Sequence, residues 1–240
     1  MVRVFLNDQG QLDPDDLHHL AHVLRLRAGD GLVAVRDGQA YEAKLSSNFP
    51  ESPEVLLGDK RLEEEKSFYL YLLQGLGKGQ KFEEILEHGT EVGVDSFFPI
   101  QMTRSIRKVQ GKEEKLKTRW EKILKKAAKQ SRRLNIPEVS LVKGLEEALE
   151  SLPEDCQVLC CYEEEKTRRL DQVLTGKEKN LALVIGPEGG LAPEEVTLIQ
   201  ARGGQCISLG PRILRTETAA LIASDRVHVL MEGGGHGREK

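Results

Sequence analysis

Two glycine–proline turns carry the residues of this sequence that are best placed to bind a ligand. The first turn lies in the stretch 181–196, which reads LALVIGPEGGLAPEEV, and the second in the stretch 206–223, which reads CISLGPRILRTETAALIA. In each turn a glycine, Gly186 or Gly210, precedes a proline, which fixes its own φ and keeps the glycine out of the helical region. Glycines let a ligand approach the main chain closely, and the neighbouring acids and bases are able to move protons.

Each turn lies between two elements that would position it. The residues before each glycine form a short apolar run without alternation, which is typical of a strand covered on both faces. Pro193 begins a helix after the first turn, with Glu194 and Glu195 in its opening turn, and Thr216 or Thr218 can cap a helix after the second. Loops at the carboxyl ends of buried strands form the crevice in which α/β sheets bind ligands. We therefore expect the two turns to share one ligand.

The same two turns resemble those of a known family. GPEGG, followed 24 positions later by LGPRILRTETA (Gly186 to Gly210), resembles the cofactor loops of the SPOUT class of RNA methyltransferases. Within that class the chain most resembles the RsmE family, which methylates N3 of a uridine in 16S ribosomal RNA. Shorter pieces at 22–26, 29–30, 78–79, 90–93, 103–105 and 130–133 also resemble that family. Lys129 and His88 stand where the family tends to place Glu and Lys, so residue-level roles there do not follow from the resemblance.

The resemblance implies a fold and a set of partners. It implies an α/β domain of the SPOUT type over residues 67–232, with about six mainly parallel strands and a C-terminal trefoil knot. A small PUA-like β-barrel that binds RNA would precede it over residues 1–66. The implied cofactor is S-adenosylmethionine, the implied substrate is 16S ribosomal RNA within the 30S subunit, and the implied assembly is a homodimer.

The two turns predict which residues would contact that cofactor. Four apolar side chains, those of Ile185, Leu209, Ile213 and Leu214, are expected to form walls around its adenine. The full set of expected contacts is Leu183, Ile185, Gly186, Pro187, Glu188, Gly189, Gly190, Leu209, Gly210, Ile213, Leu214, Arg215, Thr216 and Thr218.

Methyl transfer to a uracil nitrogen would need a base and a cation. The N3 proton must leave as the methyl group arrives, and a cation beside the carbonyl oxygens would stabilise the developing anion. Arg215 is our candidate cation, with Arg3 or Arg104 as possible helpers. Glu217 is the candidate base or orienting group and Glu188 a weaker one. An acid in the first turn of a helix is an equally good explanation of Glu217.

The middle of the chain is strongly basic. Between positions 101 and 135, 13 Lys and Arg face three Glu, a local net charge of +10 in a chain of net charge −4, which leaves −14 elsewhere. Most of this charge lies on a helix predicted over 112–134. A solvated basic face is the ordinary explanation, but so large an excess favours contact with an RNA backbone. The expected RNA contacts are Arg3, Arg25, Arg104, Arg107, Lys108, Lys125, Lys129, Arg132 and Arg133.

The cysteine and histidine patterns argue against a metal site and a redox function, and the apolar runs argue against export. The four cysteines form no C-x-x-C pair, and Cys160 and Cys161 lie in an apolar run where they should act as small buried hydrophobes. His18 and His22 are four residues apart but no third ligand accompanies them, so we expect no metal site. The first residues lack the long apolar stretch of a signal peptide, and no apolar run approaches the roughly 20 residues of a membrane span. We expect a cytoplasmic protein.

The remaining pattern supplies the elements around the turns. Strands are predicted over 2–6, 32–36, 40–45, 54–57 and 60–64 in the first domain, and over 68–74, 96–101, 139–142 and 157–162 in the second. Helices are predicted from 13 onward and over 80–92, 144–151, 168–174 and 219–230, and the tail 233–240 is expected to be disordered. Two other functions stay open: another SPOUT enzyme acting on transfer RNA or a ribose 2′-OH, and a catalytically silent RNA-binding protein.

Overall fold

The computed structural model describes residues 1–63, 66–106, 108–109 and 111–233. The chain divides into two compact units, Met1–Glu65 with Ala128–Asn135, and Lys66–Ala127 with Ile136–Lys240. The predicted domain limits of 1–66 and 67–232 did not anticipate that residues 128–135 group with the first unit. Two predictions lie outside the described residues: Arg107 as an RNA contact, and disorder over 233–240 apart from Gly233. Gly233 is the last residue of helix α7 (Thr216–Gly233), so the prediction is wrong at that position. In the described part no helix combines the length and apolar content that a membrane span requires.

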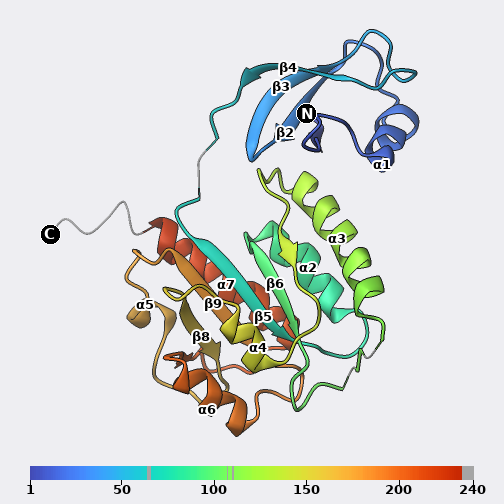
Figure 1. The fold of residues 1–240 in the computed structure, drawn as a ribbon. Coiled ribbons are helices and arrows are strands. Elements are labelled where there is room, and N and C mark those ends of the chain that lie inside the picture. Colours follow the sequence, from blue (N-terminus) through green and yellow to red (C-terminus); the bar gives the residue numbers. More distant parts are fainter. Residues whose placement is uncertain (64–65, 107, 110, 234–240) are drawn as a thin grey trace, which may run out of the picture. The chain divides into compact units, whose positions relative to one another are not determined.

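The second unit is built on a sheet of six parallel strands (Figure 1). The strands are β5 (Tyr69–Gly75), β6 (Ser96–Ile100), β7 (Glu138–Val139), β8 (Gln157–Cys161), β9 (Asn180–Ile185) and β10 (Gln205–Ile207), in the order β10-β8-β9-β5-β6-β7. β9 and β5 at the centre are almost completely buried, which is why their sequences are continuous apolar runs. The prediction of about six mainly parallel strands is confirmed.

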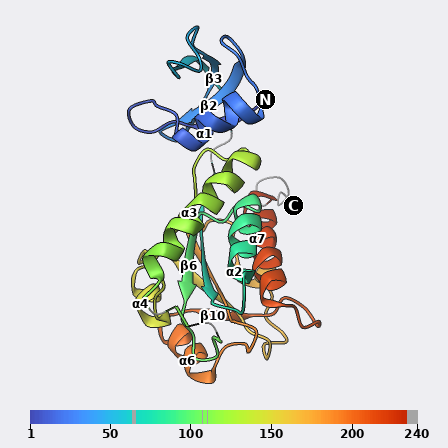
Figure 2. The ribbon, with the colours of Figure 1, turned by 90° about the vertical axis from the view of Figure 1, so that its right-hand side faces the viewer.

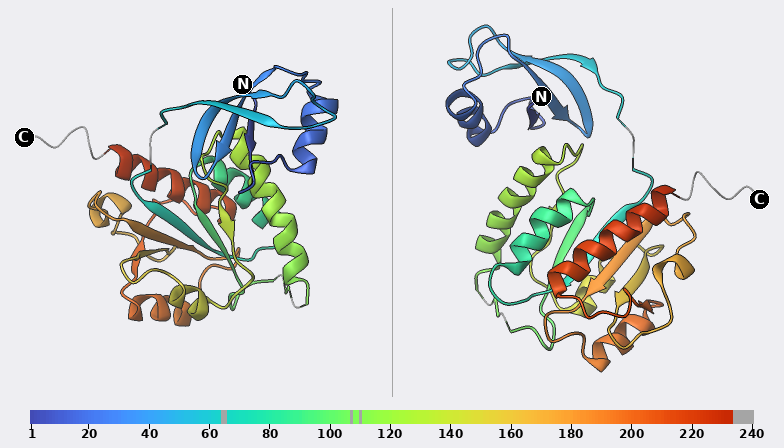
Figure 3. Two further views of the ribbon diagram at one scale, coloured as in Figure 1. Left: turned by 45° about the horizontal axis from the view of Figure 1, so that its top comes forward. Right: turned by 180° about the vertical axis from the view of Figure 1, so that it is seen from behind.

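Helices cover both faces of this sheet. On one face lie α2 (Lys81–Glu91), α7 (Thr216–Gly233) and the part of α3 (Glu113–Gln130) that contains Trp120 and Leu124. Figures 2 and 3 show α2 and α7 side by side along the strands. The other face packs against α4 (Leu145–Glu150) and α6 (Pro193–Ala201), and the short helix α5 (Leu170–Val173) adds Leu170 to the first core.

Two predicted elements in the middle of the chain are shorter than expected. The helix predicted over 112–134 ends at Gln130, because Arg132 has a left-handed φ of 59° and the Arg133 N–H bonds to the carbonyl of Ala128. This six-to-one bond with a left-handed residue is the usual way for a helix to end, and the basic sequence gives no sign of it. The strand predicted over 139–142 is only Glu138–Val139.

The first unit contains a sheet of four strands and a short helical segment. Its strands are β1 (Arg3–Phe5), β2 (Gly31–Arg36), β3 (Gln39–Leu45) and β4 (Val55–Lys60), and its helical segment is α1 (Pro14–His18) followed by a π-helical turn, His19–Val23. Asp37 and Gly38 both have positive φ, as the predicted hairpin turn requires. The prediction of separate strands over 54–57 and 60–64 is wrong, because one strand, β4, pairs with β3 across an irregularity between Tyr41 and Ala43.

Arg3 is part of the architecture of the first unit. Its guanidinium donates to the Glu63 carboxylate at 2.5 and 3.1 Å and to the carbonyl oxygens of Arg132 and Arg133 at 2.5 and 3.1 Å. Arg3 is only 8% exposed. Burial and these four hydrogen bonds argue against both predictions for Arg3, as an RNA contact and as a catalytic helper.

Candidate functional site

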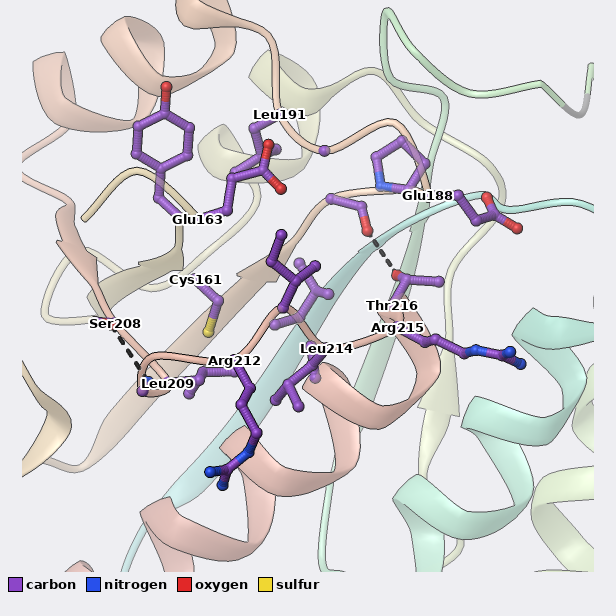
Figure 4. A pocket seen from close by; sticks show the side chains of 18 of the residues that line it. Cys161, Glu163, Glu188, Leu191, Ser208, Leu209, Arg212, Leu214, Arg215 and Thr216 are labelled. Atoms are coloured by element: carbon purple, nitrogen blue, oxygen red, sulfur yellow. Dashed lines mark hydrogen bonds between the residues drawn. The ribbon is translucent and has the colours of Figure 1, made fainter. Parts of the chain in front are cut away.

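A cavity of about 370 Å³ opens where three neighbouring strands of the second unit end (Figure 4). Because β10, β8 and β9 are adjacent and parallel, their carboxyl ends and the loops that follow them meet at one edge of the sheet. The lining residues are Lys81, Cys161, Tyr162, Glu163, Lys166, Ile185, Gly186, Pro187, Glu188, Gly190, Leu191, Ser208, Leu209, Gly210, Pro211, Arg212, Ile213, Leu214, Arg215, Thr216 and Ala219.

Part of the cavity wall is apolar. Ile185 at the end of β9 is buried, and Leu209 and Leu214 are half-buried in the second glycine loop. The Cys161 thiol joins them, and burial raises its pKa to about 12, so it stays a neutral thiol at physiological pH. Ile213 also lines the cavity, but it is 88% exposed and contributes little to the apolar wall.

At two positions beside the cavity the chain packs so closely that only glycine fits. A Cβ atom on Gly75, the last residue of β5, would lie 2.6 Å from both the nitrogen and Cδ of Pro187. Gly190 has a φ of +70°, and a Cβ atom there would lie 3.1 Å from the Glu163 carboxylate. The first glycine loop therefore lies directly against the end of a central strand, and its conformation is fixed by contacts on both sides.

A buried polar network joins three segments beneath the cavity. The Thr216 hydroxyl donates to the carbonyl of Gly186 at 2.6 Å and accepts from the side-chain amide of Gln74 at 2.8 Å. Gln74 is completely buried in β5 and also donates to the carbonyl of Gly75 at 3.0 Å. The prediction that Thr216 or Thr218 caps the last helix is wrong: Thr216 is its first residue, and its hydroxyl bonds to the other glycine loop instead.

One rim of the cavity carries a cluster of a lysine and two carboxylates. Lys81 Nζ lies 3.1 Å from Glu188 Oε1 and 3.4 Å from Glu217 Oε2. The hydrogen bond with Glu188 raises the pKa of Lys81 above its ordinary value. Partial burial would raise the pKa of Glu188, but hydrogen bonds from the Lys78 backbone N–H and from Lys81 outweigh it and leave that pKa lowered. Both groups are therefore charged at neutral pH.

The opposite rim is formed by the loop after β8. Glu165 accepts hydrogen bonds from the Thr167 N–H and hydroxyl, both at 2.8 Å, and from the Arg168 N–H at 3.0 Å. These bonds lower the pKa of Glu165 to about 2, the bond from Arg168 having the largest effect. Within the same loop Lys166 donates to the carbonyl of Glu163. The Glu165 carboxylate thus stabilises the turn that places Glu163 and Lys166 at the cavity.

A neighbouring loop, 101–105, is tied to the first glycine loop. The Arg104 guanidinium donates to the carbonyl of Gly189 at 2.9 Å. The buried Glu195 carboxylate accepts from the N–H groups of Thr103 and Ala192, each at 2.8 Å. Glu195 was predicted only as a first-turn acid, and its second partner, Thr103, comes from a segment 92 residues away.

Known proteins are similar to this chain in amino-acid sequence. A family model described as an RNA methyltransferase domain matches residues 64–228, and one described as an RNA methyltransferase PUA domain matches residues 12–48. A relative from Bacillus subtilis named ribosomal RNA small subunit methyltransferase E is 35% identical over 218 residues, which cover 87% of this chain and 85% of the relative. The chain belongs to the ribosomal RNA small subunit methyltransferase E family. The resemblance to the RsmE family is confirmed.

Solved structures extend the match to three dimensions. A ribosomal RNA small subunit methyltransferase E from Neisseria gonorrhoeae bound to S-adenosyl methionine superimposes with a TM-score of 0.83 at 26% identity, covering 96% of this chain and 98% of that one. A putative methyltransferase from Legionella pneumophila with bound SAM gives a TM-score of 0.83 at 27% identity, covering 95% and 97%. A member of this methyltransferase E family therefore has the same two-part fold with the cofactor bound.

Most of the predicted cofactor contacts come together at the cavity. Eleven of the 14 line it, and Leu183, Gly189 and Thr218 do not. Leu183 is fully buried within β9, and the carbonyl of Gly189 faces Arg104. Of the two catalytic candidates, Arg215 lines the cavity, and Glu217 reaches its rim through the contact with Lys81. Figure 4 shows the Arg212 and Arg215 side chains pointing in different directions, Arg212 downward and Arg215 to the right.

Several lining residues were missed by the sequence analysis. Tyr162, Glu163 and Lys166 follow β8. The sequence predicted this strand but not that it pairs with β9 and β10. A signal was present, because a charged run directly follows an apolar strand of the same kind as the two motif strands. Lys81 offered no comparable signal, since it reads as an ordinary residue at the start of a surface helix.

The predicted RNA contacts differ in exposure and in their partners. Arg25, Lys108, Arg132 and Arg104 are exposed, although Arg104 also holds Gly189. Lys129 forms an ion pair with the buried Asp16, and Lys125 and Arg133 are half-buried. Among the described residues, no three His, Cys, Asp or Glu side chains lie close enough together to hold a metal ion.

Proposed function

We propose that this protein transfers a methyl group from S-adenosylmethionine to ribosomal RNA of the small subunit, at N3 of a uridine in 16S RNA. The observation that carries the proposal is the cavity at the ends of β8, β9 and β10, formed by the two glycine loops on which the family resemblance rests. Family membership supports the reaction class, because the relatives are named for it. The N3 specificity and the 30S particle as substrate come from the family resemblance alone.

The cavity fits S-adenosylmethionine in size and chemistry. Its volume of about 370 Å³ lies within the range of small-molecule sites, and its lining combines an apolar wall with convergent charged groups. Ile185, Leu209 and Leu214 would hold the adenine, and the main chain at Gly186 and Gly210 would approach the rest of the cofactor. When bound, S-adenosylmethionine supplies an electrophilic methyl group.

Side chains of the protein would accept the proton of the base and stabilise the negative charge that develops on it. Glu217 is the better candidate base, because the lowered pKa of Glu188 and its bonds to Lys78 and Lys81 make that carboxylate a weak proton acceptor. Arg215 remains our candidate for the cation beside the base. Its guanidinium is exposed at the cavity mouth, where a flipped-out base would enter.

We also propose where RNA is held. Lys115, Lys122 and Lys126 are exposed on α3 at helical spacing, and we name these three residues the α3 basic stripe. Arg119 lies on the same face but pairs with Glu83 at 2.5 Å. The stripe replaces Lys125 and Lys129, which are half-buried, as the expected phosphate contact of this helix.

The test is methylation of defined RNA substrates by the purified protein. Incubation of S-adenosylmethionine with 30S subunits, free 16S RNA or transfer RNA, followed by mass spectrometry of the nucleosides, should yield 3-methyluridine in ribosomal RNA only. Arg215→Ala should fold but lose methylation. Methylation of transfer RNA or of a ribose would reassign the substrate, and cofactor binding with no methylated RNA would indicate a silent RNA-binding protein.

We further propose a homodimer in the cytoplasm and a trefoil knot at the C-terminal end, as the family resemblance implies. The apolar composition of α7 no longer supports the dimer by itself. Its apolar residues Ala220, Ala223, Val227 and Met231 are buried in the unit's own core.

A further inference from the structure

Lys81 lies at the rim of the cavity between two carboxylate side chains. It begins α2, far in sequence from both glycine loops, yet its ammonium group lies between two carboxylates. Glu188 of the first glycine loop is 3.1 Å away, and Glu217 in the first turn of α7 is 3.4 Å away. All three side chains are partly covered, with exposed fractions of 30%, 27% and 19% respectively. Three distant segments thus meet at one rim of the cavity through a single cation.

The other cations that line the cavity are held differently. Lys166 donates to a backbone carbonyl in its own loop, and Arg212 and Arg215 extend into solvent from the second glycine loop. Lys81 is half-buried and has its position set by carboxylates on two sides. A preorganised charge that needs no reorganisation during reaction stabilises a developing anion best.

The two carboxylates beside Lys81 are not equivalent. Glu188 has the shorter contact to Lys81 and also accepts from the Lys78 N–H at 3.0 Å. These bonds keep Glu188 ionised and anchor Lys81, whose own pKa is raised by the same contact. Glu217 has the longer contact of 3.4 Å, so its carboxylate is the one that is less committed and better able to accept a proton.

We propose that Lys81 is a catalytic residue for methyl transfer, an inference that rests on the function proposed above. Its ammonium group donates a hydrogen bond to the carbonyl oxygen next to the nitrogen that is methylated. The N–H bond of the base breaks and its proton passes to a Glu217 carboxylate oxygen, while the electron pair stays on the nitrogen. The resulting negative charge spreads onto the carbonyl oxygen that Lys81 contacts, and Glu188 holds Lys81 in place.

The experiment compares Lys81→Met, Lys81→Arg and the control Lys177→Met, which removes an exposed lysine that does not line the cavity. Single-turnover methylation of RNA and calorimetric titration with S-adenosylmethionine are measured on each. Lys81→Met should lower the single-turnover rate by about 100-fold, the loss typical of removing one donor to a developing anion. Its affinity for S-adenosylmethionine should stay within about threefold, since the proposed contact is with the base. Lys81→Arg should recover part of the rate, and Lys177→Met should match the wild type.

Three results would overturn the assignment. They are a Lys81→Met rate within threefold of wild type, a parallel loss of rate and cofactor affinity, or a Lys81→Arg variant no faster than Lys81→Met. Lys81→Gln replaces Lys81→Met if the latter does not fold. A wild-type protein that methylates no RNA would overturn the proposed function and this assignment together, whereas an active wild type with an active Lys81→Met variant would overturn the assignment alone.

Discussion

Thr216 shows how one hydroxyl can connect segments that the sequence keeps far apart. It begins α7, donates to the carbonyl of Gly186 in the first glycine loop, and accepts from Gln74 in β5. All of this takes place out of contact with water, where an unpaired polar group costs much more than at the surface. The threonine is therefore better explained by the position of the loop than by helix capping.

Replacing this hydroxyl by a methyl group should loosen the loop. Thr216→Val keeps the shape but leaves both the Gly186 carbonyl and the Gln74 amide short of a partner, so urea unfolding should show a loss of about 1–3 kcal/mol. Calorimetry should show weaker binding of S-adenosylmethionine as well. Thr216→Ser retains the hydroxyl and serves as the control. Equal stability of the Val and Ser variants would contradict the role of the network.

At the scale of elements, the site depends on turns as much as on strands. The loop after β8 is folded by Glu165, which accepts three hydrogen bonds from Thr167 and Arg168. The folded-state pKa of about 2 lies below the ordinary value of 4.5. A lowered pKa means that this carboxylate stabilises the folded state above pH 4.5 and loses its effect as the pH falls toward 2.

Glu165→Gln should therefore reduce stability in a pH-dependent way. At pH 7 the variant should unfold at lower urea than the wild type and bind S-adenosylmethionine more weakly, because the loop carries Glu163 and Lys166. Between pH 5 and pH 3 the difference in unfolding free energy should narrow, because Glu165 takes up its proton in the unfolded chain while it stays ionised in the folded one. Glu164→Gln, in the same exposed loop, is the control. A difference that stays constant down to pH 3 would argue against the hydrogen-bonded carboxylate.

The α3 basic stripe gives a second prediction at this scale. Changing Lys115, Lys122 and Lys126 together to Gln should weaken RNA binding at low salt. It should also reduce the dependence of log affinity on log salt by about 0.7–0.9 for each phosphate that is no longer neutralised. Filter binding across a salt series measures both effects. The matched control replaces Arg169, Lys177 and Lys179 by Gln, three exposed cations of the second unit outside the basic segment. An equal change in slope for that control would mean that the stripe has no special part in binding.

At the scale of the whole molecule, the chain is two compact units that differ in architecture. The first has a small mixed sheet and a partly buried Arg3–Glu63 ion pair, and the second has a parallel sheet with helices on both faces. The α7 helix is buried through Ala220, Ala223 and Val227, but Val229 on the same helix is 62% exposed. A single exposed valine is ordinary on a protein surface, so Val229 offers a place to test the proposed subunit contact and does not itself support it.

The proposed homodimer is tested by light scattering. At micromolar concentration the purified protein should have twice the mass of one chain, and Val229→Glu should shift the mass toward the monomer, because an apolar interface does not tolerate an unpaired charge. Val23→Glu changes an equally exposed valine in the first unit and is the control. A wild-type mass equal to that of a single chain would remove the dimer.

The sequence alone determined most of the strands and helices and the two glycine loops. Which side chains contact those loops was decided by the tertiary structure. Apolar runs, glycine–proline turns and helix starts depend on neighbouring residues, so β9, β10 and α6 could be predicted from periodicity and local chemistry. Lys81 could not, because its partners Glu188 and Glu217 become neighbours only when β5, β8, β9 and β10 take their places in the sheet. The burial of Arg3 is a similar case: its charge suggested RNA, but Glu63 and the carbonyl groups of residues 132 and 133 surround it only in the folded chain. Charge and residue type are local properties, whereas burial and partnership depend on segments that are distant in sequence and meet only in the fold.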